Sequence, residues 1–463
     1  MSINPFENYP LSWRPDKRKL KRPLYLSLVE QMRDDIKNGR LLPGTKLPPQ
    51  RELADYLDVG FSTITRAYNL SQKEGITYGR VGQGTFVSGN VNSPLIITRD
   101  RQKSTIKDLG FVASFESTNR LAASTIQSIT SSSHVVDLLN YDSPTGMPEH
   151  KITATAYLNR IGMTANAQNT VITSGGENAL VIAIFGLFHP GDRLAVDEFT
   201  YANLIEIARL HELTLVPVKG DSEGMKAESL RKICENQTIK GIYLMPDCNN
   251  PTTVTVSAKR RKRLADVIKQ FKLILIEDDY LNFFNLFRKV SLPKMSQLVP
   301  EHSIYIASMS KTLISGLRVA FMRFSDCFQH KIESVMFVLN VKTSSVDAAI
   351  VAKLLENGQG EKIMSEKISK MTKNNQVFDS VFPEAKPGNG FFRQLTIDSS
   401  LPGQQVEKAL LKNGLRVFHS DRFTVGHDPH QPFLRVSLSA IDDPMKLKVA
   451  LQALKTRLIK FNF

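Results

Sequence analysis

Apolar side chains in the first part of the chain follow helical and then extended spacing. Between Pro23 and Gly39 an apolar residue recurs every four positions, which predicts a helix with one apolar face. Two shorter helical patterns follow, joined by a glycine-containing turn, and the second runs from residue 62 to about 74. Extended segments at 76–80 and 85–88 then flank a glycine-rich tip. This order predicts a helix-turn-helix followed by a two-stranded wing.

From about residue 135 onward, short strand patterns alternate with helical patterns and short turns. Buried-strand runs at 241–244, 273–276 and 304–307 each lead into a turn of polar or small residues. This alternation favours an α/β domain with a mostly parallel sheet. The polar stretch at 91–115 lacks a clean period and is expected to be an extended linker between the two parts.

The composition is that of a globular chain with an excess of positive charge. Of 463 residues, 41% are apolar, and the net charge of +15 suggests nucleic acid or anionic ligands, with a solvated basic surface as the alternative. A basic run at 14–22 is either a flexible arm or a segment that follows DNA phosphates. Three cysteines lie far apart without metal-ligand spacing, which indicates a reducing compartment. The polar, proline-broken start and the lack of a membrane-length apolar run predict a cytoplasmic protein without membrane association.

Three motifs fall in order in the N-terminal part. They are Leu-Pro-Pro-Gln-Arg-Glu-Leu-Ala at 47–54, Ser-Thr-Ile-Thr-Arg-Ala-Tyr at 62–68 and Gly-Gln-Gly-Thr-Phe-Val at 82–87. With them, residues 20–90 resemble the winged-helix DNA-binding domain of the GntR family of bacterial regulators. Phe61 stands where that family often has an arginine before the recognition helix, which removes a phosphate or base contact. The resemblance implies that these residues contact double-stranded DNA: Arg51, Ser62, Thr63, Arg66, Gly82, Gly84 and Thr85.

A lysine at a strand end is the first candidate for cofactor chemistry. Lys311 follows the apolar run 304–307, in a polar turn that also contains Ser308 and Ser310. Partial desolvation lowers the pKa of such an ammonium group and frees the amine as a nucleophile. The amine can form a Schiff base with a carbonyl, including the aldehyde of pyridoxal phosphate. The nearby hydroxyls and the guanidinium of Arg318 could hold the phosphate, whereas a solvated surface lysine is the alternative.

Three other turns carry groups that suit the same cofactor. Ser174-Gly175-Gly176 stands between a strand and a helix, where backbone N–H groups and the helix dipole favour an anion, although an ordinary turn is the alternative. Asn250, held extended before a proline, could point its amide beyond the carboxyl end of a strand. Asp278 follows a buried strand and needs a cationic partner, either a pyridinium nitrogen or a structural salt bridge. Tyr280 could hydrogen-bond the phenolic oxygen of the ring.

The order of these turns resembles the fold-type I aminotransferases over about residues 135–460. That resemblance implies that Lys311 carries pyridoxal phosphate and that Asp278 pairs with the pyridine nitrogen. It implies that Asn250 and Tyr280 reach the ring oxygen, and that Tyr201 packs near the ring. It also implies these phosphate ligands: Ser174, Gly175, Gly176, Ser308, Ser310 and Arg318.

Near the C-terminus, Arg435 in the run 433–438 resembles the aminotransferase arginine that grips a substrate carboxylate. A bidentate guanidinium fork suits that task. Two turns depart from the usual pattern, because Thr253 replaces the glycine of Asn-Pro-Thr-Gly and Ser315 replaces the proline of Pro-Gly-Leu-Arg. The resemblance therefore implies cofactor binding and leaves transamination open.

A GntR-type winged helix followed by an aminotransferase-like domain is the arrangement of the MocR subfamily of bacterial transcription regulators. The resemblance divides the chain into a DNA-binding domain at 20–90, a linker at 91–115 and an aminotransferase-like domain at 116–463. The last has a large part at about 135–345 and a small part at about 346–463. The resemblance also implies a regulator that uses pyridoxal phosphate to sense a small amino compound, or pyridoxal phosphate itself, and that acts as a head-to-tail homodimer.

Two other functions stay open at this point. A working aminotransferase acting on an amino acid and a 2-oxo acid would use the same residues, and steady turnover would distinguish it. A DNA-binding repressor could use its C-terminal part only for dimerisation. Such a scaffold has no need of Lys311, Asp278 and Arg318, so these residues argue against it.

Overall fold

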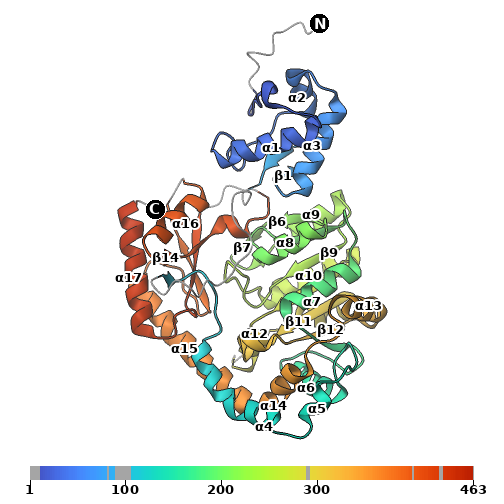
Figure 1. Cartoon of the computed structure of the whole chain (residues 1–463), viewed down its shortest axis with the longest axis vertical. Coiled ribbons are helices and arrows are strands. Elements are labelled where there is room, and N and C mark those ends of the chain that lie inside the picture. Colours follow the sequence, from blue (N-terminus) through green and yellow to red (C-terminus); the bar gives the residue numbers. More distant parts are fainter. Residues whose placement is uncertain are drawn as a thin grey trace.

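The computed structural model describes residues 11–80, 83–88, 106–287, 292–398, 401–426 and 431–461. They form an N-terminal winged helix, a large domain built on one sheet, and a small domain that ends in the C-terminal helix (Figure 1). Gly82 of the predicted wing and residues 91–105 of the predicted linker lie outside the described residues. Among the described residues, none of the helices has the length and apolarity that spanning a bilayer requires.

The winged helix packs three helices around one apolar cluster. They are α1 (Leu24–Lys37), α2 (Gln50–Leu57) and α3 (Phe61–Lys73). Side chains three or four residues apart supply the cluster, because such positions share one face of a helix. Strands β1 (Thr77–Arg80) and β2 (Gly84–Val87) pair antiparallel as the wing. The predicted helix-turn-helix and wing are confirmed, with the second helix beginning one residue earlier than expected.

The large domain is built on a seven-stranded sheet in the order β4-β12-β11-β10-β9-β5-β6. Strand β12 runs antiparallel to both of its neighbours, and the other neighbouring strands run parallel. The predicted, mostly parallel α/β sheet is confirmed. The strands are β4 (Thr170–Thr173), β5 (Arg193–Asp197), β6 (Thr214–Val218), β9 (Gly241–Leu244), β10 (Ile274–Asp279), β11 (Ser303–Ser308) and β12 (Ala320–Phe324).

Alternate residues of each strand face opposite sides of the sheet, and each side has its own apolar core. Ile304 and Ile306 of β11 pack with α7, α8 and α13 on one side. Tyr305 and Ala307 pack with α6, α14 and α15 on the other side. On this same side, a second apolar core beneath α9 and α10 extends to β6. Both faces are buried, as is usual for parallel strands. The helices of this domain are α4 (Ala123–Thr130), α5 (Val135–Leu138), α6 (Pro148–Arg160), α7 (Gly176–Leu187), α8 (Ala202–Leu210), α9 (Ala227–Asn236), α10 (Ala258–Phe271), α11 (Met295–Leu298), α12 (Met309–Thr312), α13 (Gln329–Asn340) and α14 (Ser345–Glu356).

The small domain is a three-stranded antiparallel sheet covered by helices. Its strands lie in the order β13 (Phe392–Thr396), β16 (Phe433–Ser437) and β15 (Phe418–His419). They pack against α16 (Gly403–Lys412), α17 (Pro444–Phe461) and the end of α15 (Gln359–Val381), the long helix that runs between the two domains (Figure 1). A short hairpin of β7 (Gly220–Asp221) and β8 (Gly224–Met225) belongs to the large domain.

The last part of the predicted linker is built into the small domain. Strand β3 (Lys107–Asp108) pairs parallel with β14 (Leu415–Arg416). Leu109 is fully buried, and its carbonyl oxygen accepts a hydrogen bond from the backbone N–H of Ser437 at 2.7 Å. The chain therefore enters the small domain first and crosses to the large domain afterwards.

Candidate functional site

The carboxyl edge of the large sheet collects most of the residues predicted to bind a cofactor. Parallel strands end at the same edge of a sheet, so turns that are far apart in the sequence become neighbours there. Strand β12 is antiparallel and begins at this edge, two residues after Arg318. The residues brought to the edge follow or end their strands as follows: Ser174, Gly175 and Gly176 after β4, Tyr201 after β5, Asn250 after β9, Asp278 and Tyr280 at the end of β10, and Ser308, Ser310 and Lys311 at the end of β11.

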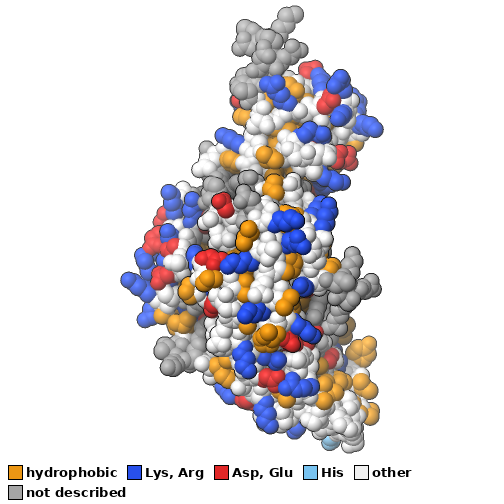
Figure 2. All heavy atoms as spheres, turned by 90° about the vertical axis from the view of Figure 1, so that its left-hand side faces the viewer, with side chains coloured by type: hydrophobic (Ala, Val, Ile, Leu, Met, Phe, Trp, Pro, Cys, Tyr) orange, Lys and Arg blue, Asp and Glu red, His pale blue; other side chains and the backbone are white. Residues whose placement is uncertain are grey.

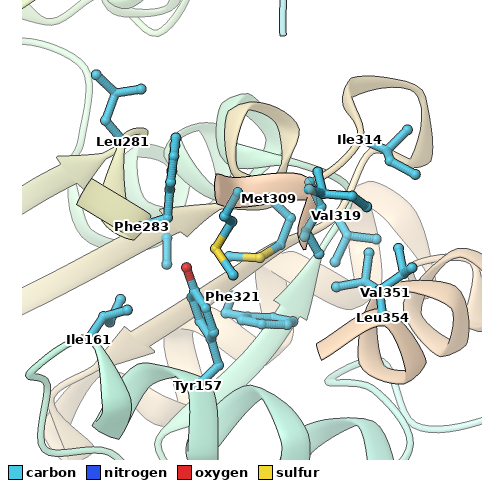
Figure 3. Close-up of a cluster of buried hydrophobic side chains, with 14 of the residues drawn as sticks. Tyr157, Ile161, Leu281, Phe283, Met309, Ile314, Val319, Phe321, Val351 and Leu354 are labelled. Carbon is cyan, nitrogen blue, oxygen red and sulfur yellow. The ribbon is translucent and has the colours of Figure 1, made fainter. Parts of the chain in front are cut away.

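Lys311 lies on α12, and the polar turn predicted from the sequence is a single helical turn. Its neighbours in the chain anchor this turn in the apolar core. Figure 3 shows Met309, Ile314 and Val319 packed in one buried cluster with Phe321. Because buried side chains flank the turn on both sides, the position of the Lys311 backbone is fixed by packing.

The Lys311 side chain reaches the segment that enters from the linker. Its Nζ donates a hydrogen bond to the carbonyl oxygen of Val112 and lies 5.7 Å from the centroid of the Phe111 ring. The Ser114 hydroxyl donates to the carbonyl oxygen of Ser310 at 2.7 Å. Residues 110–114 were assigned to the linker from the sequence, so these contacts were missed. The only local signal was the apolar run from residue 109 to 113.

Gly175, Ser310 and Arg318 line a cradle in which the hydroxyl and the guanidinium are the hydrogen-bond donors, since the backbone N–H of Gly175 already donates to the carbonyl oxygen of Thr173 at 2.8 Å. A guanidinium nitrogen of Arg318 donates to Ser310 Oγ at 3.0 Å. A Cβ at Gly175 would lie 2.5 Å from the other terminal nitrogen of Arg318, and the φ of Gly175 is +94°, so both space and backbone favour glycine there. Gly176 opens the twelve-residue helix α7, and a Cβ there would lie 3.2 Å from Ser308 Cβ. A guanidinium, a hydroxyl and a helix N-terminus are suitable donors for a phosphate.

Ser174 is the predicted phosphate ligand with the least free capacity. Its hydroxyl donates to Thr343 at 3.3 Å and accepts from Asn340 at 2.5 Å. Its backbone N–H donates to the side chain of Asn178. The residue therefore ties the turn to the region after α13.

Asp278 shares one face of the sheet with Tyr243, a residue that sequence reasoning missed. The Tyr243 hydroxyl donates to Asp278 Oδ2 at 2.8 Å. Burial, with a smaller contribution from the neighbouring charge of Asp279, raises the pKa of Asp278 to about 7, although the hydrogen bond from Tyr243 lowers it. A carboxyl group in this setting is stabilised as the anion by a cation placed opposite, such as a protonated pyridine nitrogen.

The structural salt bridge considered for the acids of β10 belongs to Asp279 instead. Lys294 Nζ contacts the carboxylates of Asp279 and Asp247, the latter at 2.5 Å. Arg261 also binds Asp247, at 2.8 Å. Burial alone would lower the pKa of Lys294, but the two carboxylates raise it above its ordinary value. This buried network, on the opposite face from Asp278, holds the end of β10 in place.

Arg435 is a buried cation that faces neutral groups. Its side chain is 2% exposed, and it donates to Asn250 Oδ1 at 2.7 Å and to the carbonyl oxygen of Gly110 at 2.8 Å. Within the described part of the chain, its Nε has no hydrogen-bond partner and no carboxylate forms an ion pair with it. Burial lowers the pKa of Arg435 to about 10. A buried guanidinium without a counter-ion is a receptor for an anionic group.

The other predicted ring contacts already have protein partners. Asn250 accepts from Arg435, and the Tyr280 hydroxyl donates to the carbonyl oxygen of Cys248 at 3.0 Å. Each keeps capacity for one more hydrogen bond, through the amide nitrogen of Asn250 and the lone pairs of Tyr280. Burial raises the pKa of Tyr201, and the charges of Asp278 and Arg435 also act on that group, as expected for a tyrosine within the same site.

Lys367 on α15 is a further residue that the sequence did not point to. It is fully buried, and its Nζ donates to Ser114 Oγ at 2.7 Å and to the carbonyl oxygens of Lys311 and Leu313. Burial and the charge of Lys311 lower its pKa well below the ordinary value. Lys367 therefore joins the interdomain helix, the Lys311 turn and the linker end.

The winged helix leaves the predicted DNA-contacting side chains accessible. Arg51, Ser62 and Arg66 are exposed, and Thr63 and Thr85 are half-buried. Gly84 has φ +114°, and a Cβ there would lie 3.0 Å from the end of the Lys46 side chain. Lys46 therefore lies beside the wing, where the sequence had not singled it out.

Both parts of the chain match known families. The profile for bacterial regulatory proteins of the gntR family covers residues 24–87, and that for aminotransferase class I and II covers residues 114–454. The HTH-type transcriptional regulator YdeF of Bacillus subtilis is 32% identical over 98% of this chain and 98% of its own length. The vitamin B6 salvage pathway transcriptional repressor PtsJ of Salmonella typhimurium is 25% identical over 90% of this chain and 94% of its own.

Solved structures confirm the fold of the C-terminal part. The kynurenine aminotransferase of Pyrococcus horikoshii superposes with a TM-score of 0.69 at 20% identity, covering 80% of this chain and 96% of that enzyme. An α-aminoadipate aminotransferase of Thermus thermophilus superposes with a TM-score of 0.68. Together with the two profiles and the full-length relative, this shows that the chain belongs to the MocR subfamily of helix-turn-helix transcription regulators, in which a GntR domain is fused to a class I and II aminotransferase domain.

Proposed function

We propose that this transcription regulator binds pyridoxal phosphate at Lys311 and uses the site to sense a small amino compound, or pyridoxal phosphate itself. The observation that carries the proposal is the meeting of Lys311, Asp278 and Arg318 at one edge of the sheet. The three groups match three different parts of one cofactor: an aldehyde, a pyridine nitrogen and a phosphate. A pure dimerisation scaffold would need none of them.

The chain divides the binding task among its elements. Lys311 would hold the aldehyde carbon, Asp278 would keep a proton on the ring nitrogen, and the cradle of Gly175, Ser310 and Arg318 would take the phosphate. When bound, pyridoxal phosphate supplies a carbonyl carbon that reacts with primary amines and an electron-withdrawing ring. Arg435 would bind the carboxylate of an amino acid, because its buried guanidinium donates to neutral oxygens of Asn250 and Gly110 rather than to a carboxylate.

Pyridoxal phosphate itself is the second candidate signal. PtsJ, which matches most of this chain, is by its name a repressor of a vitamin B6 salvage pathway. A site that holds the cofactor with a phosphate cradle and a buried carboxylate can report the concentration of that cofactor. In this case Arg435 would stabilise the fold or bind another ligand. Amino acids would then change neither the absorption spectrum of the bound cofactor nor the binding of DNA.

The segment 110–114 offers a route from the site to the DNA-binding domain. The carbonyl oxygen of Gly110 accepts a hydrogen bond from Arg435, and that of Val112 accepts one from Lys311. A carboxylate at Arg435 and a covalent bond at Lys311 would both displace this segment from its partners. Because the segment leads back to the winged helix through the linker, a ligand would favour one arrangement of the linker over another.

Covalent trapping tests the proposal. The full chain is incubated with pyridoxal phosphate, reduced with borohydride, digested and examined by mass spectrometry. We expect one pyridoxyl adduct on the Lys311 peptide, and loss of that adduct in a Lys311→Ala variant. Adducts scattered over surface lysines, or the same pattern in the variant, would show that Lys311 is not the site. Sustained formation of a 2-oxo acid from an amino acid would favour the alternative of an active aminotransferase.

A further inference from the structure

We propose that residues 13–22 form a basic arm, docked on the winged helix, that binds DNA phosphates beside the recognition helix. This arm precedes the region that matches the GntR family, which begins at residue 24. The sequence left open whether the basic run is a flexible tail or a phosphate-binding segment. Its contacts with the winged helix argue against a flexible tail and so favour the second.

Trp13 anchors the start of the arm in the core of the winged helix. It is 4% exposed and packs in the same apolar cluster as Leu28 and Met32 of α1. Its indole N–H donates to Asp35 Oδ2 at 2.9 Å, and Asp35 is held in turn by Arg40. An indole buried with its N–H satisfied fixes a segment far more firmly than exposed ion pairs do.

The middle of the arm lies against the turn of the helix-turn-helix. Asp16 accepts the backbone N–H of Arg18 at 3.1 Å and so caps a short helical turn from Lys17 to Lys19. Lys17 Nζ lies 3.3 Å from the carboxylate of Asp58. Asp58 is the residue that ends α2 just before α3. The exposed ion pair adds little stability, but it places the arm beside the start of the recognition helix.

The end of the arm leads into contacts with the recognition helix itself. The backbone N–H of Lys21 donates to Ser27 Oγ at 3.0 Å, which joins the arm to the first turn of α1. In the same turn, the Tyr25 ring lies under the Arg66 guanidinium, 4.1 Å from its centre. Arg66 belongs to α3 and is one of the residues predicted to contact DNA. The arm therefore reaches the turn before α3 through Lys17, and the first turn of α1 that follows the arm reaches α3 through Tyr25.

The charge of the arm indicates a polyanion as its partner. Residues 14–22 contain six basic side chains and one acid, Asp16. All six basic side chains are exposed, and Figure 2 shows lysine and arginine side chains across the winged-helix domain. Duplex DNA carries one charge per about 1.7 Å of axis, so a DNA bound to α3 would bring phosphates to these side chains. The six are Arg14, Lys17, Arg18, Lys19, Lys21 and Arg22.

Neutralising three arm charges tests the proposal. The variant K19Q/K21Q/R22Q of the full chain is titrated against a fluorescein-labelled duplex of about 30 base pairs of mixed sequence, over a series of salt concentrations. We expect binding weaker by roughly 10-fold or more at about 0.1 M salt, and a salt slope of log K lower by about 2 to 3, because each phosphate contact contributes about 0.9. The matched control is K259Q/K262Q/K269Q, which removes the same charge from exposed positions of α10 in the large domain.

Trp13 provides an internal check on the docking of the arm. It is the single tryptophan of the chain, so its fluorescence reports this segment alone. We expect blue-shifted emission that resists quenching by acrylamide, in the native chain and in the arm variant alike. A solvent-exposed emission in the native chain would overturn the docked arm. A salt slope and an affinity equal to those of the α10 control would overturn its contact with DNA.

Discussion

Replacing Arg435 by methionine is expected to weaken the binding of a carboxylated amine by roughly 30-fold to more than 1,000-fold, because losing one partner of a buried charge pair costs about 2–5 kcal/mol. Methionine fills much of the same volume without the charge. The retention of pyridoxal phosphate should change less, since Arg435 acts on the predicted ring position only through Asn250 and does not contact the phosphate cradle. The affinity of an Arg435→Lys variant should fall between those of the native chain and the methionine variant, because lysine keeps the charge but loses the bidentate guanidinium fork.

The measurement is a titration of the proteinogenic amino acids into the chain loaded with pyridoxal phosphate, followed by its absorption spectrum. The amino acid that binds best is then compared with the amine that lacks its carboxylate. The native chain should discriminate between the two, and the methionine variant should not. If the native chain binds both equally, or if the variant binds as the native chain does, Arg435 is not the carboxylate site.

Replacing Asp278 by asparagine is expected to stabilise the cofactor-free chain above neutral pH while weakening its hold on pyridoxal phosphate by roughly 10-fold or more, as loss of a buried charge partner implies. Burial raises the pKa of Asp278 from 3.8 to about 7, so between these values the folded chain binds a proton that the unfolded chain has lost. Stability therefore falls as the pH rises through this window and stays lower above it. The asparagine variant avoids that loss, by about 1–3 kcal/mol at high pH.

Urea unfolding without cofactor, at pH 5 and pH 8, measures this difference. Asp197→Asn is the matched control, because burial also raises the pKa of Asp197 to about 7 while its partner is Asn249 rather than the expected ring position. Relative to the native chain, both variants should be more stable at pH 8, and this difference should be smaller at pH 5. Only the Asp278 variant should lose cofactor affinity. Equal retention of pyridoxal phosphate by the two variants would remove Asp278 from the site.

The fold and the candidate site could be predicted from the sequence where one short segment contains both the structural pattern and the chemical groups. Lys311, Asp278 and the Ser174–Gly176 turn each follow an apolar strand run, and the topology of a parallel sheet brings such turns to one edge. The helix-turn-helix was predictable for the same reason, since its turn residues and its apolar spacing are local. One boundary was wrong: the run at 273–276 continues to Asp279, so Asp278 lies inside strand β10.

What the sequence did not indicate depends on contacts between distant segments. Tyr243 is two strands away from Lys311 in the sheet and touches Asp278 only because β9 and β10 pair in that register. Lys367 meets the Lys311 turn from a helix that follows it in the chain, and Gly110 meets Arg435 across 325 residues. Trp13 gave no sign of its anchoring role, because its partner Asp35 lies on a helix that begins after the arm.

The affinity of the full chain for DNA, with and without pyridoxal phosphate, tests the central claim most directly. The duplex is selected from a random-sequence pool by the native chain and then titrated with the cofactor-free and the loaded protein. We predict affinities that differ by about 10-fold or more, as a coupling of 1–3 kcal/mol implies, and a Lys311→Ala variant whose affinity does not respond to pyridoxal phosphate. Equal affinities of the native chain in the two states, with the cofactor demonstrably bound, would contradict the account.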